Sequence, residues 1–76
     1  MKATLNSTPE GTTVIVTELT HEASMRQRLE DIGLIVGSKI RCLQRSPAGD
    51  PAAYLICGAV IALRNKDAER VLITNI

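Results

Sequence analysis

The sequence predicts a mainly β domain: a small antiparallel barrel of about five strands, with an α-helix inserted after the first strand. Short runs rich in β-branched and aliphatic residues alternate with Gly and Pro turn signals. A single clear amphipathic helix interrupts these runs. With no Trp, no Phe and one Tyr, the core must be aliphatic. Short strands hide their edges best by closing on themselves, so we expect a barrel.

The first strand and the helix have readable boundaries. A turn at Pro9-Glu10-Gly11 precedes a β-branched strand over 12–19. Ser24, followed three residues later by Gln27, is typical of a capping box at a helix start. We expect the helix to bury one apolar face and to end at a left-handed glycine, after which the next residue folds back. The face consists of Met25, Leu29 and Ile32, and the ending residues are Gly33 and Leu34.

The sequence of the second half of the chain predicts four further strands and one short helical turn. Gly37 precedes the second strand, a proline-bounded loop follows it, and Gly58 joins the third and fourth strands tightly. We expect Asn65 to cap the helical turn. The expected strands are 39–44, 52–57, 59–64 and 71–76, with the loop at 46–51 and the turn at 66–69.

Size and composition limit the possible functions. Seventy-six residues make one domain, 1–76, and a formal net charge of +1 argues against an extended nucleic-acid surface. The N-terminus has no basic start followed by an apolar run, and the run 54–63 is about half a membrane-spanning length. We therefore expect a soluble, cytoplasmic protein.

Three blocks of the sequence form a recognisable combination: Arg28-Leu29-x-x-Ile32-Gly33-Leu34-x-x-Gly37, Pro47-x-Gly49-Asp50-Pro51 and Gly58-x-x-Ile61-Ala62-Leu63-Arg64. Together, and in this order, they resemble the FeoA family. The resemblance implies an SH3-like barrel and a non-enzymatic accessory role in bacterial ferrous iron uptake. It also implies a partner, the cytosolic GTPase region of a FeoB-type permease, and contact with a membrane only through that partner. The chain departs from the usual family pattern at Thr8, Val36 and Ala48.

The same resemblance leaves a second interpretation open. FeoA-like domains are similar to the C-terminal module of metal-dependent repressors, so a metal-sensing or regulatory domain is the alternative. No DNA-binding motif precedes the domain in this sequence, which favours the transport accessory. Weak self-association also remains open.

The residues suggest no catalytic or cofactor site. The sequence has no Gly-rich phosphate loop or nucleophile motif, and His21 is its single histidine. The nearest acidic residues, Glu18 and Glu22, are the weak candidates for a metal site with His21. Their spacing does not converge on one ion, so a solvated helix entrance is the simpler interpretation. Tyr54 alone cannot form a base-stacking platform for RNA.

The roles of the two cysteines have two interpretations. Cys42 and Cys57 are too few for a disulfide scaffold and are typical small hydrophobic strand residues. If the 46–51 loop closes a hairpin, however, the two thiols could be neighbours and support redox or soft-metal chemistry.

A partner surface is the remaining functional possibility. Strand alternation places Leu43, Leu55 and Cys57 on the outer face of the barrel, where a small domain needs no apolar residues. Either this face binds a partner or the inserted helix covers it. The outer face of the helix, with Arg26, Arg28 and Glu30, is a second candidate surface.

Overall fold

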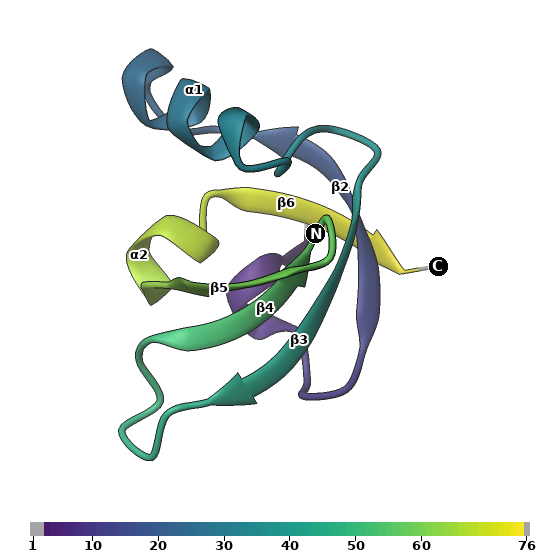
Figure 1. Ribbon diagram of the computed structural model, residues 1–76, viewed down its shortest axis with the longest axis vertical. Coiled ribbons are helices and arrows are strands. Elements are labelled where there is room, and N and C mark those ends of the chain that lie inside the picture. The colour runs from purple at the N-terminus through teal and green to yellow at the C-terminus, as the bar shows by residue number, and fades with distance from the viewer. Residues whose placement is uncertain (1–2, 76) are drawn as a thin grey trace.

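The computed structural model describes residues 3–75 as a single curled antiparallel sheet with two α-helices and one short 3-10 helix (Figure 1). The strand order across the sheet is β1-β6-β2-β3-β4-β5. The elements are β1 (Ala3–Thr4), η1 (Leu5–Ser7), β2 (Thr13–Leu19), α1 (Ala23–Asp31), β3 (Lys39–Arg45), β4 (Ala52–Ile56), β5 (Ala59–Leu63), α2 (Asn65–Ala68) and β6 (Val71–Asn75).

The mainly β architecture with a helix after an early strand is confirmed, and one strand is added to it. The extra strand is β1, two residues that pair with Leu72 and Ile73 of β6. A two-residue strand carries no alternation of its own and is defined by its partner, so the sequence did not reveal it. Residue 76, the end of the expected last strand, lies outside the described residues.

The core lies on the concave face of the sheet. Alternate residues of each strand point inward, so the buried set follows a period of two along the strands. Four residues from outside the sheet complete it: Leu5 of η1, Leu29 of α1, Leu34 and Ala68 of α2. The fully buried large side chains are Tyr54, Leu5, Leu34, Ile40, Ile56, Val14, Val16, Val71 and Cys42.

The helix α1 begins earlier than the capping-box pattern predicted. Its N-cap is Glu22, which has extended backbone angles and makes no side-chain cap bond. Ser24 already lies inside the helix and donates to the Glu22 carboxylate, while Gln27 donates to Asp31. The prediction of a reciprocal Ser24–Gln27 capping box is therefore wrong, because each of these side chains bonds to a carboxylate instead of to the backbone N–H groups of the helix start.

The end of α1 is the one predicted. Gly33 has φ +96°, and the N–H groups of Gly33 and Leu34 donate to the carbonyls of Glu30 and Leu29 at 3.0 and 2.9 Å. This is a Schellman ending, and Leu34 is completely buried behind it. Leu29 is buried as expected, but Ile32 is 38% exposed, so its assignment to the core was wrong.

The start of α2 is held by the loop between β3 and β4. The N–H of Asn65 donates to the Asp50 carboxylate at 3.0 Å, and the Asn65 amide donates to the Gly49 carbonyl at 3.3 Å. Asn65 is therefore the first helical residue rather than the cap, and Arg64 takes the cap position. The Gly49-Asp50-Pro51 motif, with a cis Asp50–Pro51 peptide bond, has a structural role here.

No helix in residues 3–75 has the length and apolar character required to cross a bilayer.

Candidate functional site

The convex face of β3, β4 and β5 carries an exposed apolar surface. Leu55 stands between Arg41 on β3 and Val60 on β5 in the strand register. Leu43 lies two residues beyond Arg41, at an irregularity in the β3–β4 pairing. We call this surface the outer strand face and define it as Arg41, Leu43, Ala53, Leu55, Val60 and Ala62.

The inserted helix does not cover the outer strand face. Leu43, Leu55 and Val60 are 37%, 36% and 66% exposed. Figure 1 shows α1 at the upper end of the molecule, where β2 ends and β3 begins. The alternative that α1 buries Leu43 and Leu55 is therefore wrong. Exposed apolar side chains that adjoin on one sheet face are uncommon on monomers and mark interaction surfaces.

Val60 is the most exposed apolar residue of this face, and sequence reasoning did not single it out. The available signal was the tight turn at Gly58. A two-residue turn between β4 and β5 fixes the register and sets Val60 opposite Leu55. Val60 therefore continues the Leu43–Leu55 surface onto the last strand of the sheet.

Cys57 is not on the outer strand face. It follows β4 with φ +49°, and together with Gly58 at φ +78° it forms the two-residue β4–β5 turn. Its Sγ lies 3.6 Å from the Gly33 carbonyl, and a Cβ added to Gly33 would clash with that sulfur. The thiol thus packs against the end of α1 and leaves no room there for a larger residue than glycine.

The two cysteines are free and lie in different environments. Cys42 is completely buried opposite Tyr54 in the β3–β4 ladder, whereas Cys57 is exposed in the next turn. Burial raises the pKa of the Cys42 thiol, and the nearby Arg45 guanidinium partly offsets that rise. The suggestion that the thiols are neighbours is wrong, because they are separated along the strand and face opposite environments.

The second candidate surface is the solvent side of α1. Arg26, Arg28 and Glu30 are all exposed there. Behind them, the turn between α1 and β3 exposes a second apolar group, Ile32, Ile35 and Val36. Gly37, which follows it, has φ +93° and open space around it, so its role is the turn itself.

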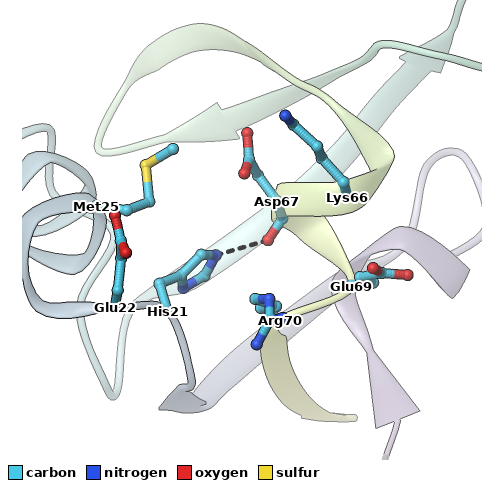
Figure 2. A pocket seen from close by; sticks show the side chains of 7 residues that line it. All are labelled: His21, Glu22, Met25, Lys66, Asp67, Glu69 and Arg70. Carbon is cyan, nitrogen blue, oxygen red and sulfur yellow. Dashed lines mark hydrogen bonds between the residues drawn. The ribbon is translucent and has the colours of Figure 1, made fainter.

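A hollow of about 420 Å³ lies between the entrance of α1 and α2 (Figure 2). His21 is its central side chain and is 7% exposed. Its Nε2–H donates to the Asp67 carbonyl at 2.7 Å, and its Nδ1 is buried without a partner. The remaining lining residues are of mixed charge: Glu22, Met25, Lys66, Asp67, Glu69 and Arg70. His21 therefore ties the α1 entrance to α2.

The structure does not bring the three weak metal candidates together. Glu18 lines a different hollow with Thr17 and Leu72, on the β2–β6 side. In Figure 2 the Glu22 carboxylate points along Met25, away from the His21 ring. Within residues 3–75, no three His, Cys, Asp or Glu side chains are grouped so that they could hold a metal ion.

Comparison with known proteins places the chain in a family. The FeoA domain model matches residues 3–75. The chain belongs to the FeoA family. FeoA proteins are non-enzymatic factors of ferrous iron transport, and the prediction that the chain is not an enzyme is confirmed on that ground.

Solved structures give the same fold. FeoA of Chlorobium tepidum is 30% identical with a TM-score of 0.92, over 97% of this chain and 70% of that one. Zinc-complexed FeoA of Stenotrophomonas maltophilia, described as a prokaryotic SH3 domain protein, is 26% identical with a TM-score of 0.83. The match covers 95% of this chain and 89% of the Stenotrophomonas protein. The SH3-like barrel is thus confirmed.

One further similarity concerns the fold alone. A manganese-dependent transcriptional repressor is 21% identical with a TM-score of 0.85, over 99% of this chain and 41% of the repressor. No curated protein matches the chain significantly.

Proposed function

We propose that this FeoA-family chain is a cytoplasmic accessory protein of ferrous iron uptake that binds the cytosolic GTPase region of a FeoB-type permease. Family membership supports the ferrous iron system as its setting. It acts as a protein–protein interaction module, without a cofactor, and it meets the membrane only through its partner.

The observation that carries the proposal is the uncovered outer strand face. Leu43, Leu55 and Val60 lie on three adjacent strands and are all more than a third exposed. These side chains point away from the core and stay in contact with solvent in the folded chain. Their transfer from water into an interface would favour binding by about 25 cal/mol for each Å² of apolar surface buried.

The charge beside this face indicates the chemistry of the partner. Arg41 stands next to Leu55, and the exposed Lys39 precedes Arg41 by one outward position on β3. Within β3, β4 and β5 the sequence contains no acidic residue. An apolar patch with carboxylates at its rim would complement this surface, because rim charges of opposite sign favour association.

The test is a binding titration of the chain with the soluble cytosolic domain of the permease. We expect Leu55→Glu to weaken binding at least about tenfold, because it places a charge at the centre of the proposed interface, where hot-spot residues cost about 2 kcal/mol or more when they are lost. Thr74→Glu is the matched control, since it adds the same charge to an exposed residue of β6 and should leave affinity unchanged.

A second variant separates the two candidate surfaces. Arg28→Glu reverses an exposed charge on α1 and should leave binding intact if the outer strand face is the docking surface. Loss of binding in Arg28→Glu with full binding in Leu55→Glu would place the partner on α1 instead. No binding of the unmodified chain in any nucleotide state of the permease domain would refute the proposal.

A further inference from the structure

The strand β5 is an open edge of the sheet. It pairs with β4 through all five of its residues and lies last in the strand order, so no other strand within residues 3–75 pairs with its second side. The opposite edge, β1, is only two residues long. A free strand edge presents a row of main-chain donors and acceptors that can pair with another chain.

The β4–β5 turn identifies which groups are free. In a hairpin with a two-residue turn, the closing pair, here Ile56 and Ala59, exchanges both hydrogen bonds, and bonded and non-bonded pairs then alternate. Ala59, Ile61 and Leu63 therefore face β4. The N–H and C=O groups of Val60 and Ala62 face outward, and no hydrogen bond formed within residues 3–75 outside the ladder reaches them.

This edge lacks the features that usually protect edges from pairing. Its sequence, Ala-Val-Ile-Ala-Leu, contains no proline and no charged side chain. Natural edge strands commonly carry lysine, proline or a bulge for protection. The β4–β5 register is also regular throughout, so no bulge twists β5 away.

We propose that β5 pairs antiparallel with β5 of a second copy of this chain, about a two-fold axis at Ile61. In this register Val60 faces Ala62 of the second copy. The two residues exchange two hydrogen bonds, and the symmetry-related pair adds two more, so every outward group of both residues is satisfied. A two-fold interface requires such self-complementarity.

The side chains are complementary in the same register. Val60 projects from the outer strand face and is 66% exposed. Ala62 borders a hollow of about 200 Å³, lined mostly by small and aliphatic groups, at the β3–β4 end of that face. Val60 of each copy lies beside Ala62 of the other, so its isopropyl group meets the hollow at its Ala62 border. The lining residues are Gln44, Arg45, Ser46, Pro51, Ala52, Ala53 and Ala62.

The charges near the edge do not oppose the pairing. Arg64, the first charged residue after β5, lies opposite Gly58 of the second copy. The two Arg64 residues are therefore at opposite ends of the paired strands and do not repel each other closely. Because five residues a side form a small contact, below the roughly 1,200 Å² of a standard interface, we expect a weak dimer that forms at high concentration. This pairing does not depend on the proposed function, and it joins two outer strand faces into one continuous surface.

The test compares Val60→Lys with Val36→Lys by analytical ultracentrifugation from about 10 μM to about 1 mM, the range of weak interfaces. Val36 is the matched control, because it is 62% exposed and lies in the turn after α1. We expect the unmodified chain and Val36→Lys to dimerise alike, and Val60→Lys to raise the dissociation constant at least about tenfold. A monomer throughout the range, or equal effects of the two variants, would overturn the proposal.

Amide hydrogen exchange of the unmodified chain tests the same pairing without a variant. The Val60 and Ala62 amides should exchange more slowly at high than at low protein concentration, and the already paired Ile61 amide should not change. Concentration-independent exchange at Val60 and Ala62 would contradict self-pairing. Protection that appears only when the permease domain is added would also overturn it, in favour of a strand supplied by that partner.

Discussion

At the scale of single residues, the two thiols should differ in reactivity. The Cys42 thiol is buried, and this burial raises its pKa, whereas Cys57 is exposed in the β4–β5 turn. Since the thiolate is the nucleophile, we expect iodoacetamide at neutral pH to modify Cys57 in the folded chain and both cysteines after denaturation. Mass spectrometry of tryptic peptides measures this difference, and Cys57→Ser should abolish labelling of the folded chain. Modification of Cys42 under native conditions would contradict its burial.

The alternation of residues in β3 and β4 was predictable, but the conformation of Cys57 was not. Leu43 and Leu55 are exposed as the period of two predicts. Leu55 lies between two completely buried residues, Tyr54 and Ile56, and Leu43 follows the buried Cys42. Cys57 continues an apolar run and so resembles a sixth strand residue. Its positive φ follows from the tight turn with Gly58, a conformation that cysteine seldom adopts and that composition does not indicate.

At the scale of elements, the Asp50 carboxylate should stabilise α2. It accepts the N–H of Asn65, one of the donors that a helix start leaves unpaired. We expect Asp50→Ala to lower the free energy of unfolding by about 1 kcal/mol, as loss of a cap does, and Asp50→Asn to retain most of it through its amide oxygen. Urea denaturation measures both. Asp31→Ala, which removes only the exposed bond from Gln27, should cost a few tenths of a kcal/mol.

Equal destabilisation by Asp50→Ala and Asp50→Asn would show that the carboxylate does not act as a cap.

The end of α1 was predicted from the sequence, but the start of α2 was not. The end of α1 depends on Gly33 and the four residues before it, which the sequence displays together. The start of α2 depends on a carboxylate fifteen residues away, and only the folded β3–β4 loop brings it there.

At the scale of the whole molecule, the barrel was predictable because its signals are repeated in every strand. Aliphatic runs of strand length, separated by glycines at turns, specify a small β domain whichever strand is considered. The open edge at β5 and the uncovered outer strand face are properties of the assembled sheet. They depend on the strand order and on where α1 lies, which a pattern along one strand does not contain.

The core itself should make the whole fold sensitive to alkali. Cys42 and Tyr54 are paired across β3 and β4 and are completely buried. Burial raises the pKa of the thiol above its ordinary value of 9.0, and burial together with the neighbouring thiol raises that of the Tyr54 phenol above 10.0. Both groups therefore keep their protons longer in the folded chain than in the unfolded chain.

Because the folded chain binds these protons more tightly, stability should be complete below about pH 9 and should fall as pH rises further. Urea denaturation at a series of pH values from neutral to alkaline measures the free energy of unfolding. Cys42→Ala should be less stable throughout, from the cavity it leaves, and should lose less stability through the first alkaline step. Cys57→Ala, which removes an exposed thiol, should retain the slope of the unmodified chain. A free energy of unfolding that stays constant up to pH 10 and beyond would contradict the raised pKa values of Cys42 and Tyr54 in the folded chain.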